Sequence, residues 1–359
     1  MITVGIIGTR GIPNGHGGFE RFVELLVDDA RWGDTEVRFK VFGEAADREY
    51  NPWTDLRDVG FTKNERPFWY YFRSAMLATE ECDIVLCCGV ALSIFSFWPP
   101  LHGKALVINP DGCEWRRTKW SLPGRLAVRM MYLPALLAAR RVVIDAEALR
   151  EDFNLGPKAW YIPYSAPEPT VSPMPDEARD ALDLHRPYML VVARLEPENN
   201  VQAIVQAFAA LDQTEVDLIV VGGKTTPFYE SGLKGWERDN IRFVGPIYDQ
   251  DRLNQLRSNC IAYMHGHSVG GTNPSLLEAL ATVTGELICH DNKYNREVAG
   301  NNASYFRDVP HLSQLMNSVL SSDARASWNG RAPVRDVRFH PDTIFNRYLE
   351  FFRSTHAAR

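Results

Sequence analysis

One segment of the chain combines groups that could bind an anion and a sugar diol. A glycine-rich turn leads into the start of a helix, and its residues are Gly270, Gly271, Thr272, Asn273, Pro274, Ser275 and Leu276. Glycine allows a ligand to approach the backbone closely. Asn273 is a good N-cap, and Pro274 suits the first helical position. Free N–H groups of Ser275 and Leu276 would then point out of the helix start and favour a phosphate.

A carboxylate follows on the same helix. Glu278 stands three residues after Ser275 and lies on the same helical face. Its two oxygens can accept hydrogen bonds from both hydroxyls of a ribose. A phosphate at the helix start and a ribose at Glu278 together predict a nucleotide site. An ordinary capped helix after a glycine-rich turn is the alternative interpretation.

A second glycine-rich loop lies near the start of the chain. Residues 2–8 are apolar and predict a buried parallel strand, and a helical pattern begins at Phe19. A strand, a glycine-rich loop and a helix in this order are typical of a nucleotide or phosphate site. The loop does not have the G-x-G-x-x-G spacing. Glu44, after the second predicted strand, could imitate the ribose-binding acid of a dinucleotide fold, so a dinucleotide site is an alternative.

Five motifs in this chain resemble the retaining glycosyltransferases of family 4. The two longest are residues 6–20, IIGTRGIPNGHGGFE, and residues 265–279, HGHSVGGTNPSLLEA. Residues 109–117, 193–200 and 245–249 extend the resemblance across most of the chain. The closer match is the bacterial subgroup that includes rhamnosyltransferases acting on lipid-linked sugars. The resemblance implies an α/β fold with two Rossmann-like parallel-sheet domains facing a cleft, which is called GT-B.

Length and composition agree with a globular protein of two domains. The chain has 359 residues, of which 45% are hydrophobic and 23% are charged. A net charge of −6 argues against nucleic-acid binding over the whole surface. No apolar run approaches the length of about 18 residues that a membrane span needs, and a strand starting at Ile2 leaves no room for a signal peptide. The six cysteines form no C-x-x-C pair, which favours reduced thiols over a disulfide or a zinc site.

Strands and helices alternate in both halves, which predicts two α/β domains with parallel sheets. The predicted strands are 2–7, 36–42, 83–88, 105–109 and 142–144, then 188–193, 216–221, 241–244, 260–264 and 287–289. Helical patterns at 199–211 and 250–258 separate strands of the second half. Residues 163–187 contain six prolines and predict a stiff, exposed connection.

These patterns place an N-terminal domain at residues 1–165 and a C-terminal domain at residues 166–340. The resemblance implies that the first domain binds the acceptor and that the second binds the nucleotide-sugar donor. The last helix, 341–359, carries an apolar stripe that includes Ile344 and Phe352. In the family this helix packs back on the first domain.

Sugar transfer requires fixed positive potential, because the nucleoside diphosphate leaves with extra negative charge. Arg194 follows a predicted strand end and matches the arginine that contacts the donor diphosphate in the family. A surface ion pair with Glu196 or Glu198 is the alternative interpretation. The family usually has a lysine six residues after this arginine, whereas this chain has Asn200. Lys224, at another strand end, could supply the missing charge.

Glycines complete the predicted donor site. Gly17 and Gly18 belong to the first loop, and Gly270 stands where the wider family often has a glutamate that contacts the transferred sugar. The subgroup that the chain resembles shares this glycine. The expected catalytic residues are Asp111, Arg194 and Glu278.

Asp249-Gln250-Asp251 fits D-x-D, a metal–diphosphate motif of other glycosyltransferases. It stands just before a helical run that includes Leu256 and Arg257, where Asp249 would be an N-cap and Asp251 a first-turn acid. The helix-cap interpretation is favoured. Because Arg194 and the helix start before Glu278 can hold the diphosphate, we expect neither a metal ion nor a cofactor.

Acceptor-binding candidates lie in the first domain, and they are Arg10, His16, Asp111, Glu114, Arg116 and Arg117. Asp111 and Glu114 follow the strand 105–109, where a carboxylate could orient or deprotonate an acceptor hydroxyl. The alternative for Asp111 is a turn-forming residue. The resemblance implies same-face attack, in which the leaving phosphate helps to remove the proton and Asp111 positions the acceptor. His267 is a further candidate in the second domain.

The segment 115–143 contains seven basic residues and no acid, interleaved with apolar side chains. In a chain of net charge −6, this bias indicates an anionic lipid surface or a lipid diphosphate. Aromatic clusters at 68–72 and 95–98 could line the same region. A buried helix with basic ends is the alternative. We expect a peripheral enzyme on the inner face of the bacterial cytoplasmic membrane.

The expected reaction moves L-rhamnose from dTDP-β-L-rhamnose to a polyprenyl-diphosphate-linked saccharide in cell-surface polysaccharide synthesis. The donor and the acceptor rest on the resemblance. A UDP- or GDP-sugar donor is the first alternative. A Rossmann-type NAD(P)-dependent oxidoreductase and a non-catalytic sugar-nucleotide sensor are the others.

Overall fold

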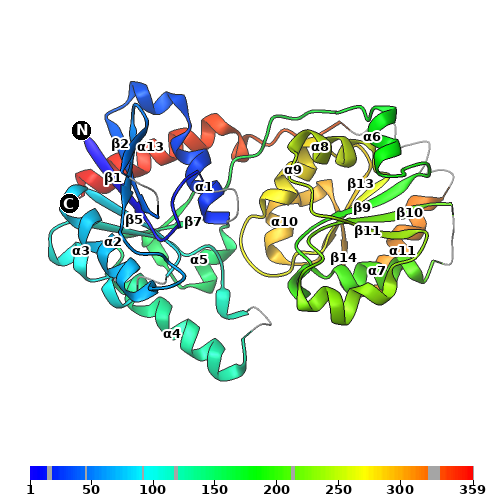
Figure 1. The fold of residues 1–359 in the computed structure, drawn as a ribbon, viewed down its shortest axis with the longest axis horizontal. Coiled ribbons are helices and arrows are strands. Elements are labelled where there is room, and N and C mark those ends of the chain that lie inside the picture. The colour runs from blue at the N-terminus through cyan, green and yellow to red at the C-terminus, as the bar shows by residue number, and fades with distance from the viewer. Residues whose placement is uncertain are drawn as a thin grey trace. The chain divides into compact units, whose positions relative to one another are not determined.

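The protein divides into two compact units, each built around its own sheet (Figure 1). The structure, a computed structural model, describes residues 1–13, 18–44, 47–90, 93–116, 120–211, 215–321 and 332–358. Unit 1 comprises residues 1–164 and 342–359, and unit 2 comprises residues 165–341. These bounds differ by one residue from those predicted for the two domains and the last helix.

Unit 1 contains an eight-stranded sheet with the order β3-β4-β2-β1-β5-β6-β7-β8. Its strands are β1 (Ile2–Ile7), β2 (Val37–Gly43), β3 (Arg48–Asn51), β4 (Thr54–Asp58), β5 (Ile84–Cys88), β6 (Ala105–Asn109), β7 (Arg141–Ile144) and β8 (Ala159–Tyr161). All neighbours pair in parallel except β3 and β4. β5 and β6 are buried along their whole length, which explains their continuous apolar sequences.

The helices of unit 1 are α1 (Gly18–Val27), α2 (Pro67–Glu81), α3 (Trp98–Leu101), α4 (Leu122–Ala138), α5 (Ala148–Asp152) and α13 (Pro341–Ala357). α13 comes from the end of the chain, and Phe351 and Phe352 on its apolar stripe are fully buried in the core of this unit. Arg353 also pairs with Glu36 at 2.7 Å. The last helix therefore belongs to unit 1.

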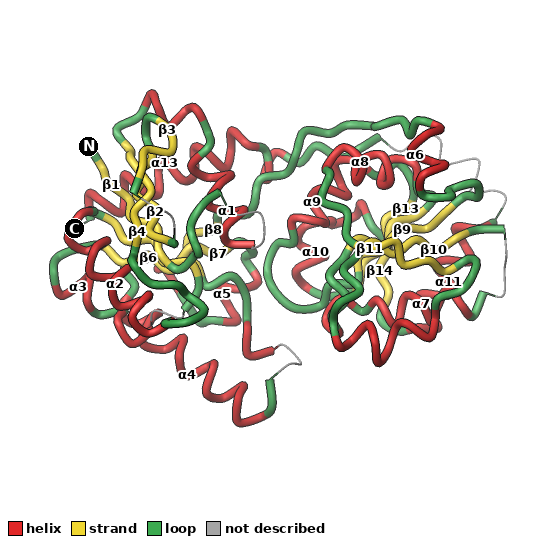
Figure 2. The backbone as a smooth tube through the Cα atoms, viewed as in Figure 1, coloured by secondary structure: helices red, strands yellow, loops and turns green. Residues whose placement is uncertain are grey.

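Unit 2 contains a six-stranded, fully parallel sheet with the order β11-β10-β9-β12-β13-β14. Its strands are β9 (Tyr188–Val192), β10 (Asp217–Val221), β11 (Ile241–Gly245), β12 (Ala262–His265), β13 (Glu286–His290) and β14 (Ser304–Phe306). Its helices are α6 (Asp176–Ala181), α7 (Val201–Ala209), α8 (Gln250–Asn259), α9 (Pro274–Thr282), α10 (Lys293–Ala299) and α11 (Val309–Leu320). Figure 2 shows the strands of this sheet enclosed by helices.

The predicted fold class, α/β with two Rossmann-like parallel-sheet units, is confirmed. Every predicted strand is present, and the missed strands are β3, β4, β8 and β14. These four lie at or beside the sheet edges. An edge strand is covered on fewer sides, so its sequence carries a weaker apolar pattern.

The prediction of an exposed connection at residues 163–187 is wrong for part of that segment. The N–H of Thr170 donates to the backbone oxygen of Ala281, and the N–H of Ser172 donates to Oγ of Ser258 at 3.0 Å. Met174 is 8% exposed. Prolines stiffen this segment, but the N–H groups between them still find acceptors on unit 2.

Candidate functional site

The glycine-rich segment of unit 2 lies between β12 and α9, at the carboxyl edge of the sheet. Asn273 caps α9, because its side chain accepts a hydrogen bond from the N–H of Ser275 at 2.9 Å. The N–H of Leu276 donates to the backbone oxygen of Asn273 at 3.0 Å. The prediction that the N–H groups of Ser275 and Leu276 are free is therefore wrong, because the cap satisfies both. The positive end of the helix dipole is what this helix start offers an anion.

The turn before Asn273 requires glycine at position 270. Gly270 has a φ of +120°, a conformation that residues with a Cβ rarely adopt. Thr272 is buried, whereas Gly271 is partly exposed. Gly270 is partly exposed as well.

Glu278 forms an ion pair that was not predicted from the sequence. Nη2 of Arg257 on α8 lies 2.5 Å from Oε2 of Glu278 on α9. The side chain of Arg257 is 1% exposed and that of Glu278 is 29% exposed. Within the described part of the chain, Oε1 of Glu278 accepts no hydrogen bond. This oxygen is therefore available for a ribose hydroxyl.

Ser275 is engaged within the protein through both of its polar groups. Its N–H is held by the cap, and its Oγ lies 2.8 Å from the hydroxyl of Tyr263 on β12. Burial raises the pKa of Tyr263. The predicted donor residue Ser275 thus fixes the start of α9 to the sheet.

The segment that follows Arg194 holds the glycine-rich loop. The N–H and Oγ of Ser268 both donate to the backbone oxygen of Glu198, at 2.9 and 2.8 Å. Nδ1 of His267 lies 2.8 Å from Oδ1 of Asn199. A Cβ on Gly266 would lie 2.1 Å from the backbone oxygen of Asn199, so only glycine fits there. The motifs 193–200 and 265–279 therefore meet at one edge of the sheet.

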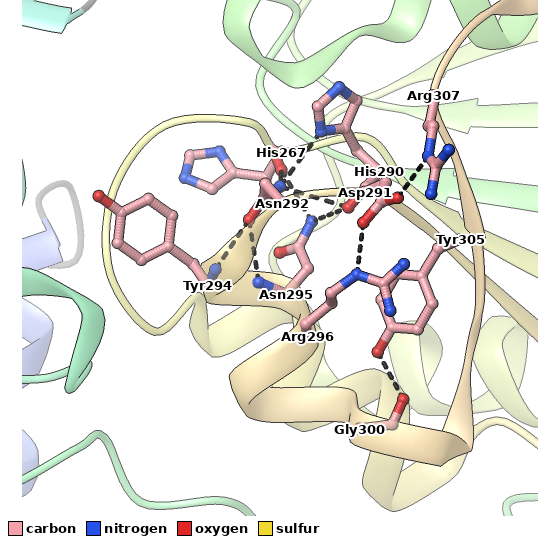
Figure 3. Close-up of polar contacts among 10 residues, drawn as sticks. All are labelled: His267, His290, Asp291, Asn292, Tyr294, Asn295, Arg296, Gly300, Tyr305 and Arg307. Carbon is pink, nitrogen blue, oxygen red and sulfur yellow. Dashed lines mark hydrogen bonds and ion pairs between the residues drawn. The ribbon is translucent and has the colours of Figure 1, made fainter.

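Two asparagines hold the loop from α10 (Figure 3). The side chains of Asn292 and Asn295 each donate to the backbone oxygen of His267 at 2.9 Å. Asn292 is also the N-cap of α10. His267, a candidate side chain in the sequence, is thereby fixed through its backbone as well as its ring.

Asp291 forms a compact charged cluster beside these asparagines (Figure 3). Its carboxylate lies 2.5 Å from Nε of Arg296 and 2.8 Å from Nε of Arg307. Both arginines hold the pKa of Asp291 well below its usual range. The charges of Arg296 and Arg307 are therefore directed at Asp291.

His265 ends β12, directly before the glycine-rich loop. It is 4% exposed, and its Nε2 has no hydrogen-bond partner within the described residues. Burial lowers the pKa of His265 to about 3, and the neighbouring His267, Arg257 and His290 lower it further in the same direction. His265 is therefore a neutral imidazole at neutral pH.

Two predicted cations follow β9 and β10 at the same carboxyl edge. Arg194 is 62% exposed and lies 3.4 Å from Glu196, the ion pair that was the alternative interpretation. Nζ of Lys224 lies 2.5 Å from Oε1 of Glu237, which also accepts a hydrogen bond from Tyr229 at 2.8 Å. The charge of Lys224 is thus closely balanced, whereas that of Arg194 is more open to a ligand.

Asp249 acts as a helix cap, as the favoured interpretation of D-x-D predicted. Its carboxylate accepts a hydrogen bond from the N–H of Arg252 at 2.7 Å, and Asp251 lies in the first turn of α8. Within the described ranges, no group of three or more His, Cys, Asp or Glu side chains is arranged to hold a metal ion.

In unit 1, Asp111 follows β6 in a tight turn. Its φ is +66°, and its N–H donates to Oδ1 of Asn109 at 3.1 Å. This is the turn-forming role that was the alternative for Asp111. Burial raises the pKa of Tyr164, and the charges of Asp111 and Asp145 add to that rise.

The other acceptor candidates differ in how far the structure places them. Glu114 and Arg116 form a short 3₁₀ turn after Asp111, and Arg116 pairs with Asp152 at 2.8 Å. Gly18 is exposed at the first position of α1. The candidates that lie outside the described residues are His16, Gly17 and Arg117.

Arg10 belongs to a polar cluster at the carboxyl edge of β1. Its N–H donates to Oε1 of Glu20 at 2.8 Å. Nζ of Lys63 donates to the backbone oxygen of Gly8 at 2.7 Å, and burial lowers the pKa of Lys63. The N–H of Lys63 donates to Oε1 of Glu44 at 2.8 Å. Glu44 is therefore engaged locally, which weakens its interpretation as the acid of a dinucleotide site.

Comparison with known families finds a match within the second unit. Residues 176–333 match the family described as Glycosyl transferases group 1. This part of the chain is therefore similar to a group 1 glycosyltransferase domain. The search of curated proteins found no match to this sequence.

Solved structures extend the likeness of fold to both units. Sucrose-phosphate synthase from Thermosynechococcus elongatus has a TM-score of 0.78 at 14% identity, over 100% of each chain. HepE from Anabaena, in complex with UDP-glucose, has a TM-score of 0.75 at 14% identity, over 99% of this chain and 100% of that chain. An α,α-trehalose-phosphate synthase from Burkholderia xenovorans has a TM-score of 0.68 at 12% identity, over 99% and 100%. The predicted GT-B fold class is thereby confirmed.

In unit 2, Asn200 has a role that its sequence position did not indicate. Asn200 has a left-handed φ of +50°, and its Nδ2 donates to the backbone oxygen of Gly266 at 2.8 Å. At the place of the lysine that the resemblance implies, this chain therefore has a residue that supports the glycine-rich loop.

Proposed function

We propose that the protein is a retaining hexosyltransferase that moves a sugar from a nucleotide-sugar donor to an acceptor hydroxyl. The observation that carries this proposal is the arrangement of the glycine-rich loop, the start of α9 and Glu278 at one sheet edge of a group 1 glycosyltransferase domain. The positive helix end favours a diphosphate. The free oxygen of Glu278 suits a ribose hydroxyl.

The proposed reaction follows from these groups. The bond between the anomeric carbon and the diphosphate oxygen breaks, and the acceptor oxygen forms a new bond on the same face of the sugar. The departing phosphate oxygen takes the proton of the acceptor hydroxyl. Arg194 and the start of α9 stabilise the growing negative charge, and Asp111 orients the acceptor. The proposal includes no metal ion, because these groups supply the positive potential.

Two donors are proposed in order. L-rhamnose from dTDP-β-L-rhamnose rests on the resemblance of the five sequence motifs. A UDP-sugar is the second candidate, because HepE was solved in complex with UDP-glucose. The two differ at the nucleoside, since the thymidine sugar lacks the 2′-hydroxyl. Glu278 can accept a hydrogen bond from the 3′-hydroxyl that both nucleosides carry.

The proposed acceptor is a polyprenyl-diphosphate-linked saccharide at a membrane surface, and α4 supports this. Along α4 an apolar stripe consists of Leu122, Leu126, Met130, Leu133 and Leu137, which are 51 to 79% exposed. Their spacing of four, four, three and four residues places them on one helical face. The buried residues of the 17-residue helix are Tyr132 and Ala135, which lie outside this stripe.

Neighbouring elements extend the apolar surface. α4 contacts the short 3₁₀ turn Ser93–Phe95, where Ile94 is 74% exposed, and Leu101 on α3 is 78% exposed. Residues 115–143 contain no acid, and Arg125 and Arg129 stand on α4 beside the stripe. Exposed apolar side chains with flanking arginines are typical of a helix that lies in the interface of an anionic bilayer.

The described residues contain no helix with the length and hydropathy that crossing a membrane requires. The proposed attachment is therefore peripheral. The sequence predicts basic residues interleaved with apolar side chains in this segment. Arg116 is paired with Asp152, whereas the apolar stripe of α4 is exposed.

Donor binding tests the proposal first. The thermal unfolding of the full chain is measured with dTDP-rhamnose, UDP-glucose and GDP-mannose. A donor at one hundred times its Kd adds about 2.7 kcal/mol of stability, so one of these sugars should raise Tm clearly. Stabilisation by NADH alone would favour the oxidoreductase. Donor binding without transfer to any acceptor would favour the sensor.

A further inference from the structure

Arg257 is a buried cation, and its burial does not favour the stability of the fold. It lies in the last turn of α8 and is 1% exposed. Its Nη2 pairs with Glu278, while its Nε and Nη1 have no hydrogen-bond partner in the part of the chain that the structure describes. Burying a guanidinium with unsatisfied donors is unfavourable. An apolar side chain would fit the face of α8 that also carries Leu253 and Leu256.

The surroundings of Arg257 leave Glu278 as its counter-charge. Tyr263 and His265 lie close to it on β12, and neither is negatively charged at neutral pH, because burial raises the pKa of Tyr263 and lowers that of His265. The ion pair with Glu278 is the one that Arg257 makes within the described ranges. The charge of Arg257 is therefore directed at a single carboxylate.

That carboxylate has two distinct oxygens. Oε2 of Glu278 is held by Arg257, and Oε1 is without a hydrogen bond in the described chain. The Glu278 side chain is 29% exposed, so one side of it faces solvent while the other faces the buried guanidinium. Fixing one oxygen restricts the rotation of the side chain and thereby orients the other oxygen.

We propose that Arg257 is a positioning residue that orients the Glu278 carboxylate toward a ribose hydroxyl of the donor. The inference rests on the proposed function, since it assigns Glu278 to the ribose. Arg257 is too deeply buried to touch the nucleotide itself. It acts through its ion pair with Glu278.

Selective loss of ribose recognition distinguishes this role from a general structural one. Isothermal titration of the full chain compares UDP with 3′-deoxy-UDP, and dTDP with 3′-deoxy-dTDP. We expect the wild type to bind at least one parent nucleotide about tenfold more tightly than its 3′-deoxy analogue. In Arg257→Met, parent and analogue should bind within about twofold of each other, both near the wild-type affinity for the analogue.

Further variants distinguish a failure of the proposed role of Arg257 from a failure of the proposed function. Arg257→Lys should recover part of the discrimination, and Arg257→Gln provides a second test with a polar side chain. Unfolding curves of each variant without ligand show whether it is folded. Arg257→Met that keeps the full preference for the 3′-hydroxyl, while Glu278→Gln loses it, would overturn the role of Arg257 alone. A preference kept by Glu278→Gln, or absent from the wild type, would overturn the ribose assignment and this inference with it.

Discussion

Units 1 and 2 are both built on parallel sheets, yet their surfaces differ. Unit 1 exposes the apolar stripe of α4, with further apolar side chains on neighbouring elements. In the described part of unit 2, the strongly exposed large apolar side chains are Val171, Tyr248 and Val337, which lie on separate segments. One architecture therefore presents two kinds of surface.

Unit 2 differs in how its glycine-rich loop is held. In unit 2 the loop at the carboxyl edge is held through Ser268 and by Asn292 and Asn295. The ion pair of Arg257 joins α8 to α9 in the same unit. Such a loop is suited to a small charged ligand whose position must be exact to a fraction of an ångström. The two units therefore show that the fold does not determine the binding partner. The loops at the sheet edge and the outer helices determine it.

The largest expected effect is the loss of transfer in Glu278→Gln. Losing a charge-assisted contact to the ribose should weaken donor binding by roughly 1.5–3 kcal/mol. The variant also leaves Arg257 without its counter-charge, so Tm should fall as well. Activity and thermal unfolding are measured together. Glu230→Gln, which alters a surface pair with Lys234, is the control and should change neither.

The apolar stripe of α4 gives the second effect. Leu126, Met130 and Leu133 are replaced together by serine, and co-sedimentation with anionic vesicles is measured. Each apolar side chain buried in the bilayer contributes on the order of 1 kcal/mol or more, so vesicle binding should fall by about a hundredfold or more.

Two controls sharpen this second test. Leu25→Ser replaces another exposed leucine of unit 1, 51% exposed on α1, and should leave vesicle binding unchanged. Raising the salt concentration weakens the contribution of Arg125 and Arg129 but not that of the stripe. Wild-type protein that does not bind anionic vesicles at low salt would contradict the proposed membrane attachment.

His265 predicts a pH effect of moderate size on unit 2. Its pKa is lowered to about 3 by burial, so between about pH 6.5 and pH 3 the unfolded chain binds a proton that the folded chain does not. The free energy of unfolding should therefore decrease as the pH falls, by up to about 1.4 kcal/mol per pH unit from this group. Urea unfolding of the wild type and of His265→Leu at pH 7, 6, 5 and 4 measures the difference. Parallel pH dependences of the two proteins would contradict it.

A smaller effect is expected at Lys224 than at Arg194. Lys224 is 2.5 Å from Glu237, whereas Arg194 is 62% exposed and 3.4 Å from Glu196. We expect Arg194→Ala to weaken donor binding by about tenfold or more, and Lys224→Met by a few-fold at most. Donor affinities of both variants are compared by titration. A larger loss in Lys224→Met would mean that Glu237 releases Lys224 to the donor.

The smallest expected effect is that of a chelator. Asp249 is occupied as the N-cap of α8, and the proposed diphosphate contacts are Arg194 and the start of α9. Saturating EDTA should therefore leave the transfer rate nearly unchanged. Complete loss of activity that magnesium or manganese restores would show that Asp249 and Asp251 are ligands.

Features set by short stretches of sequence could be predicted. The strands that lie inside the sheets have continuous apolar sequences, and the caps Asn273 and Asp249 stand directly before helical patterns. The sequence predicts the cap at Asn273. It does not predict that this cap occupies the N–H of Ser275. A cap satisfies the same N–H groups that an anion would need.

Features set by contacts between distant segments could not be predicted. Arg257 and Glu278 are separated by twenty-one residues, and the pairing depends on how α8 packs beside α9. The bonds from Ser268 to Glu198 join segments seventy residues apart. The one available signal was an arginine on an otherwise apolar helix face at position 257, where a burial pattern alone predicts an apolar side chain.

The most direct test of the central claim is sugar transfer by the purified full chain on anionic vesicles that contain a polyprenyl-diphosphate-linked saccharide. Radiolabelled dTDP-rhamnose and UDP-glucose are supplied separately, and label in the lipid fraction is measured. We predict that one donor labels the lipid and that Glu278→Gln abolishes the labelling. A wild type that labels no lipid from either donor, or a Glu278→Gln variant as active as the wild type, would contradict the account.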